Sequence, residues 1–71
     1  MSIGKIKKLV FDNLNKEVNF RVNGSRNQVE EFSGQIISVY PVIFTVKCLD
    51  KDMIRSFSYT DILIGDLELL I

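Results

Sequence analysis

The sequence predicts a mainly β fold, a small five-stranded barrel of the SH3-like or Sm-like kind preceded by an N-terminal α-helix. Three features predict this fold: one stretch with helical periodicity, several short β-rich runs separated by turn residues, and a long run that contains a glycine. The chain has 71 residues, a size at which only about 60% of the unfolded chain's surface is buried on folding. We therefore expect one domain over residues 1–71, with the helix at about 2–14 and the barrel at about 17–71.

The first element is an amphipathic helix of about three turns. Its apolar residues at helical spacing are Ile3, Ile6, Leu9, Val10 and Leu14. Lys5, Lys7 and Lys8 fall mostly on the opposite side, and Ser2 is placed to cap the N-terminus. The spacing then changes, because Val18, Phe20 and Val22 alternate with polar residues, which predicts a half-buried strand.

Turn residues and one glycine shape the middle of the chain. Asn23-Gly24 favours a hairpin turn. The β run from residue 28 to residue 40 contains Gly34, which indicates a bulge or a sharp bend that lets one strand serve two sheets. Tyr40-Pro41 predicts a corner between strands, because proline lacks an N–H and favours extended geometry in the residue before it.

The remaining elements are short. Val42, Phe44, Val46 and Cys48 form the most regular apolar face, and Phe44 at its middle is the expected centre of the core. A polar turn at 50–52, a strand at 54–59, a helical turn at 60–63 and a strand at 67–71 complete the order. For Asp61 we favour a capping role, through backbone N–H groups of the two residues that follow it, over a surface contact.

Composition argues against an enzyme. Nine basic residues balance nine acidic ones, and the chain has no histidine and one cysteine, so the commonest general base and an internal disulfide are absent. Glu30 and Glu31 are adjacent on a strand and point to opposite faces, and Asp50 with Asp52 is better explained as a solvated turn. We expect no catalytic residues, no cofactor and no metal site, and a cytoplasmic protein without a signal peptide or a membrane span.

Binding is the remaining function class. The candidate partner-binding residues are Arg21, Asn23, Arg26, Tyr40 and Tyr59. The arginines flank the first hairpin, and an exposed tyrosine in a small barrel can stack on a nucleic-acid base. The competing interpretation is that the lysines form the solvated face of the helix and that the tyrosines belong to the rim or the core.

Four motifs carry a family resemblance. They are VNGSR at 22–26, SG at 33–34, YPVIF at 40–44 and SYTDIL at 58–63. In this order after a short helix, the set resembles the Veg family of small proteins from Gram-positive bacteria, known as biofilm formation stimulators. The resemblance implies a small β-barrel without enzymatic activity that opposes a transcriptional repressor of biofilm genes. The chain departs from the family pattern at Gly24-Ser25, where the family has two glycines followed by several basic residues; here only Arg26 follows.

Two functions are therefore compatible with the sequence. The leading hypothesis is a cytoplasmic regulatory module that binds a protein, such as a transcriptional regulator, and the alternative is a nucleic-acid-binding barrel; the salt dependence of binding separates them. We also expect a homodimer, because Leu69 and Leu70 point to opposite sides of the last strand and one core covers only one side. The N-terminal helix or the last strand is the expected interface.

Overall fold

A computed structural model describes residues 2–24 and 28–71 and confirms the predicted order of elements. The elements are α1 (Ile3–Asp12), β1 (Glu17–Asn23), β2 (Val29–Val39), β3 (Ile43–Cys48), β4 (Met53–Ser58), α2 (Tyr59–Leu63) and β5 (Leu67–Leu70). The five strands form one antiparallel sheet in the order β4-β3-β2-β1-β5. The mainly β fold class with an N-terminal helix is confirmed. Among the described residues no backbone ladder joins β4 to β5, so the barrel stays partly open along one side.

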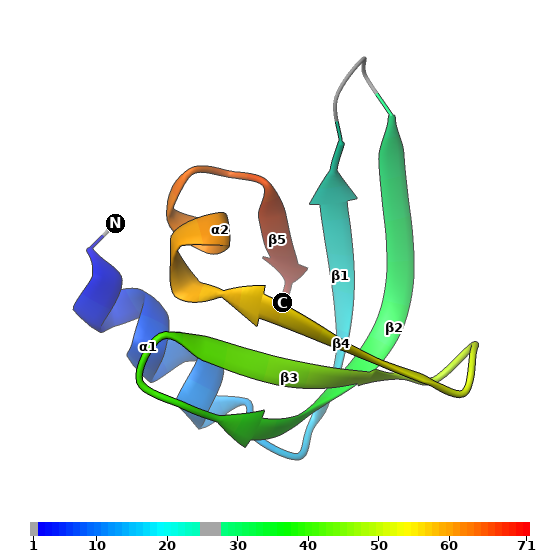
Figure 1. Ribbon diagram of the computed structural model, residues 1–71, viewed down its shortest axis with the longest axis horizontal. Coiled ribbons are helices and arrows are strands. Elements are labelled where there is room, and N and C mark those ends of the chain that lie inside the picture. Colours follow the sequence, from blue (N-terminus) through cyan, green and yellow to red (C-terminus); the bar gives the residue numbers. More distant parts are fainter. Residues whose placement is uncertain (1, 25–27) are drawn as a thin grey trace.

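The long strand β2 curves strongly and links the two halves of the sheet (Figure 1). It pairs with β1 as far as Gln35 and with β3 from Gly34 onward. A Cβ atom at Gly34 would lie 2.5 Å from Cγ1 of Val46 and 3.1 Å from a ring carbon of Phe20, so the glycine leaves room for these two core side chains. The expected bulge is not at Gly34, since the register shift falls between Ile36 and Ser38. The bend serves two halves of one sheet, where two sheets were expected.

Tyr40 and Pro41 form the predicted corner between β2 and β3. The Tyr40 N–H donates to the carbonyl of Ile43 at 2.8 Å, so Pro41 and Val42 make the connection. The inward position expected for Val42 is wrong: the residue is 68% exposed, because the alternation of the strand begins only at Ile43. The other three members of that face are buried, and they are Phe44, Val46 and Cys48.

The core is organised around a row of aromatic rings. From β1 to α2 the row consists of Phe20, Phe32, Phe57, Phe44 and Tyr59. Successive ring centroids are 5.3, 6.3, 6.1 and 5.5 Å apart, within the range in which aromatic pairs attract. Phe44 has no exposed surface, so its predicted central position is confirmed. The contact between Phe32 and Phe57 joins β2 to β4 across the open side of the barrel, where no backbone ladder does so.

Both helices lie on the same side of the molecule in Figure 1. The side chain of Ser2 accepts from the backbone N–H of Lys5 at 3.3 Å, which confirms the predicted N-cap of α1. Ile6 and Val10 are fully buried, and the helix packs mainly on α2 and β2. The apolar stripe of α1 therefore has a partner inside the domain.

A capping box begins the second helix. The Ser58 hydroxyl accepts from the Asp61 N–H at 3.1 Å, and the Asp61 carboxylate accepts from the Ser58 N–H at 2.9 Å. The predicted capping role of Asp61 is thus confirmed, but its partner precedes it in the chain instead of following it. Tyr59, expected at the end of a strand, is the first residue of α2.

The first hairpin differs from the expected tight Asn-Gly turn. Asn23 is the last residue of β1 and pairs with Val29, so residues 24–28 connect the strands. Residues 25–27 lie outside the described part of the chain. The candidate Arg26 is one of them, so the structure gives no position for it.

Candidate functional site

The corner between β2 and β3 presents an exposed hollow with mostly apolar walls. Its volume is about 210 Å³, and its lining residues are Ile3, Lys7, Pro41, Val42, Tyr59 and Thr60. Next to it Tyr40 is 51% exposed, which keeps this predicted binding residue available. We call these residues together the corner surface. It joins the first two turns of α1, the corner and the start of α2, which are distant in sequence.

Tyr59 is the buried residue that holds the corner surface in its shape. Its ring is only 4% exposed and packs against Phe44, while its hydroxyl donates to the carbonyl of Tyr40 at 2.6 Å. The backbone N–H of Tyr59 donates to the carbonyl of Val42 at 3.3 Å. Both bonds fix the shape of the corner. A buried ring cannot stack on a base, so for Tyr59 the assignment to the rim or the core is correct and base stacking is excluded.

The charge beside the hollow is positive. Lys7 places its Nζ 5.5 Å from the centroid of the Tyr59 ring, a cation–π distance. In the ranges 2–24 and 28–71, no carboxylate lies within ion-pair distance of Lys5, Lys7 or Lys8. Phe11, one helical turn after Lys7, is 61% exposed. The surface therefore combines apolar area with uncompensated positive charge, which fits a partner segment that is apolar and acidic.

Arg21 lies outside this surface and its charge is neutralised. Its guanidinium contacts Glu31 on β2 and Glu68 on β5, with N–O distances of 3.2 Å to each. The hydrogen bond and the Coulombic attraction from Glu31, followed by those from Glu68, raise the pKa of Arg21 above its ordinary value. An arginine held by two carboxylates is poorly placed to bind a phosphate, which is also anionic.

Asn23 is also engaged within the fold. Its side-chain amide donates to the carbonyl of Gly65 at 2.7 Å, and its backbone N–H donates to the carbonyl of Asp66 at 2.8 Å. Gly65 has a φ of 84°, a left-handed conformation that glycine adopts readily. Asn23 thus fastens the end of β1 to the turn before β5. Of the five predicted residues, the structure brings Tyr40 and Tyr59 together and places Arg21 and Asn23 elsewhere.

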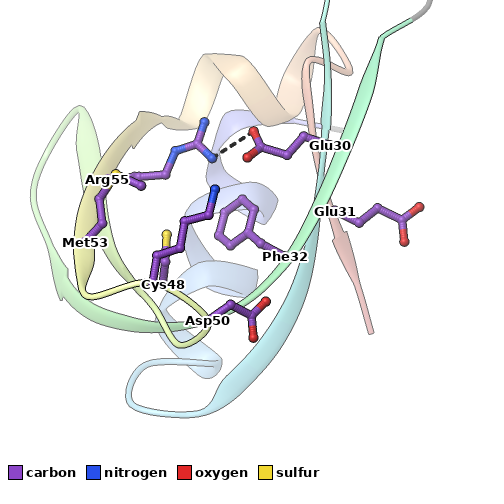
Figure 2. A pocket seen from close by; sticks show the side chains of 8 residues that line it. Glu30, Glu31, Phe32, Cys48, Asp50, Met53 and Arg55 are labelled. Carbon is purple, nitrogen blue, oxygen red and sulfur yellow. Dashed lines mark hydrogen bonds and ion pairs between the residues drawn. The ribbon is translucent and has the colours of Figure 1, made fainter.

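A second, smaller pocket lies in the open side of the barrel between β2 and β4 (Figure 2). Its volume is about 70 Å³, enough for water but too small for an ordinary organic ligand. Arg55 from β4 reaches across to Glu30 on β2 with an N–O distance of 3.0 Å, and its guanidinium carbon lies 5.0 Å and 5.1 Å from the ring centroids of Phe32 and Phe57. We call this contact the seam. Its arrangement joins two strands that share no backbone ladder.

Sequence reasoning missed Lys7, Val42 and Arg55. Lys7 was classed with the solvated helix face, and only the packing of α1 beside α2 brings it over a tyrosine ring. The exposed position of Val42 could have been predicted from the sequence, because a residue directly after a corner proline belongs to the turn. No residue near Arg55 in the sequence predicts its contacts, since its partner Glu30 lies on a strand that comes close only because the sheet curls.

Within residues 2–24 and 28–71, no three histidine, cysteine or acidic side chains gather as a set of metal ligands. None of the helices described has the length and apolar character required to span a bilayer.

A family model described as "Biofilm formation stimulator VEG" matches residues 1–70, nearly the whole chain. No curated protein matches the chain.

Proposed function

The chain belongs to the Veg family of biofilm formation stimulators, and from this premise we propose that it is a non-enzymatic regulatory protein of the cytoplasm that opposes a transcriptional repressor by binding it directly. The corner surface is the observation that carries the proposal. It exposes Tyr40 and Val42 beside Lys7, for which the described part of the chain shows no carboxylate partner. Such a surface binds an acidic, apolar segment of the repressor.

Nucleic acid is the weaker alternative. The chain has no net charge, Arg21 is held by two carboxylates and Tyr59 is buried. The lysines of α1 and the exposed ring of Phe11 are the features that favour it. A contact that releases several phosphate counterions weakens steeply with salt, whereas a largely apolar protein contact does not.

The test measures binding of the purified chain to the purified repressor of biofilm genes from the same organism, at about 50 and 200 mM salt. We expect less than about a tenfold loss of affinity over this range, against about a thousandfold for six or more phosphate contacts. Val42→Lys should weaken binding about tenfold or more, because it places a charge in the apolar centre of the contact. Val29→Lys is the matched control, since Val29 is 56% exposed at the opposite end of β2.

Three results would contradict the proposal: no binding to the repressor, equal weakening by both valine variants, or binding that requires nucleic acid and falls steeply with salt. The third result would establish the nucleic-acid alternative. Circular dichroism of both variants shows that the fold is retained.

A further inference from the structure

Among the described residues that line the hollow of the corner surface, only Lys7 carries a charge. Its ammonium group lies 5.5 Å from the centroid of the Tyr59 ring, and Ile3 precedes it by one helical turn on the same face of α1. Contact with the ring restricts where this exposed charge lies at the wall of the hollow. A charge that is already positioned loses less conformational freedom when it pairs than a freely moving one does.

The two other lysines of α1 lie elsewhere on the helix surface. With about 3.6 residues per turn, Lys8 is rotated by roughly a quarter of a turn from Lys7, and Lys5 by roughly half a turn. Neither of them is among the residues that line the hollow. All three side chains are exposed and carry the same charge, so Lys5 and Lys8 are matched controls for the position of Lys7.

Two acidic residues belong to the helices that form this surface, and neither neutralises Lys7. The carboxylate of Asp61 accepts from the Ser58 N–H at 2.9 Å and caps α2. Asp12 follows Lys7 by more than one helical turn, beyond the spacing at which side chains on one helix meet. Within residues 2–24 and 28–71, no carboxylate lies within ion-pair distance of Lys7. The charge at the hollow is therefore available to a carboxylate of a partner.

The rest of the hollow is mainly apolar. Ile3, Pro41 and Val42 form these walls, and a partner that covers the exposed side chain of Val42 removes apolar surface from water. The volume of about 210 Å³ is below the roughly 300 Å³ of a small-molecule site, so the hollow suits a side chain of a docked segment better than a free ligand. Thr60 adds a hydroxyl that can donate a hydrogen bond.

We propose that Lys7 selects the partner of the corner surface by pairing with one carboxylate that lies directly beside an apolar side chain. This assignment rests on the proposed function and names the chemical unit that the surface recognises in the repressor. The apolar side chain packs against Ile3, Pro41 and Val42. The carboxylate accepts hydrogen bonds from the Lys7 ammonium and the Thr60 hydroxyl. The apolar walls accept many side chains, so the charge of Lys7 decides which segment binds, and a basic segment is repelled.

A carboxylate fits this arrangement better than a phosphate does. A phosphate group carries more than one negative charge and is usually bound by clusters of arginine or by bidentate arginine contacts. The described lining of the hollow offers one ammonium group, no guanidinium and apolar walls. The single charge of an aspartate or glutamate side chain is balanced by Lys7 alone.

The first test compares single variants in the binding of the purified chain to the purified repressor. Lys7→Met keeps an unbranched apolar stem and removes the charge, and we expect it to weaken binding about fivefold or more. Lys7→Arg keeps a cation that can lie over a ring, so its affinity should stay within about twofold of wild type. Lys8→Met and Lys5→Met each remove one charge outside the hollow and should also stay within about twofold.

The valine variants separate a failure of this assignment from a failure of the proposed function. If Val42→Lys weakens binding while Lys7→Met and Lys8→Met act alike, the repressor binds at the corner surface and selection by Lys7 is overturned. If the repressor does not bind, or if Val42→Lys and Val29→Lys act alike, the proposed function itself fails. Circular dichroism of each lysine variant shows that the fold is retained.

A titration of the chain with small probes tests carboxylate recognition without the repressor. The probes are the acetylated dipeptide amide of leucine and aspartate, its asparagine counterpart and inorganic phosphate, each added to about 10 mM and followed by NMR chemical shifts. The aspartate dipeptide should shift the amide signals of Val42 and Thr60 most. Lys7→Met should remove this difference between the probes, and Lys8→Met should keep it. Equal responses to the three probes, including no response to any of them, or a larger response to phosphate would overturn the proposal.

Discussion

Two arginines mark two differently built regions of the same sheet. Arg21 and Arg55 both pair with glutamate on a neighbouring strand, with N–O distances of 3.0–3.2 Å. Arg21 lies on the outer face of strands that are already joined by backbone ladders on both sides. Arg55 lies at the seam, where β2 and β4 meet without a ladder and its guanidinium covers two phenylalanine rings. We therefore expect the two ion pairs to contribute differently to stability. Only the pair formed by Arg55 joins two strands that have no backbone ladder between them.

The largest effect is expected from the aromatic row that both regions share. Phe44→Ala should lower the free energy of unfolding by about 3–5 kcal/mol, because it leaves a cavity at a fully buried site. That loss is comparable to the whole stability of so small a domain. Chemical denaturation followed by circular dichroism measures it. A variant that unfolds at nearly the same denaturant concentration as wild type would show that the row does not hold the two regions together.

Replacing each arginine tests the contrast directly. Arg55→Ala should lower the free energy of unfolding by about 1–2 kcal/mol, since it removes the cover of two rings as well as the ion pair. Arg21→Ala should change the melting temperature little, because its ion pairs are solvent-exposed and salt-screened. Thermal melts at low and high salt compare the two variants. Equal losses would mean that the seam is no more dependent on its side chains than the laddered region.

The smallest effect is a labelling rate at the seam. Cys48 is 4% exposed and lines the same pocket as Arg55, so its thiol should react slowly with a thiol reagent in the native state. In Arg55→Ala the reaction should become faster, whereas in Arg21→Ala it should keep the wild-type rate. Denatured protein supplies the unprotected reference rate. Rapid labelling of the native wild type would contradict a closed seam.

Residues whose neighbours are local were predictable from the sequence. The Ser2 cap, the corner at Tyr40-Pro41 and the buried position of Phe44 each follow from spacing over a few positions. The seam was not predictable, because Arg55 meets Glu30 only through the curl of the sheet. The contacts of Tyr59 were not predictable for a similar reason: its ring packs on Phe44 and its hydroxyl donates to the carbonyl of Tyr40, and only the complete fold brings these residues together.

The position of β1 inside the sheet also has a consequence for biosynthesis. β1 is the first strand of the chain, yet its second neighbour is β5, the last one, which pairs Asn19 with Leu70. A ribosome adds about 5–20 residues per second, so several seconds pass between the synthesis of β1 and that of β5. During this time the side of β1 that later pairs with β5 has no partner. Throughout that interval the nascent chain exposes an edge that the finished protein hides. The final residues of the domain act as a closing strand, and translation has to deliver them before the sheet is complete.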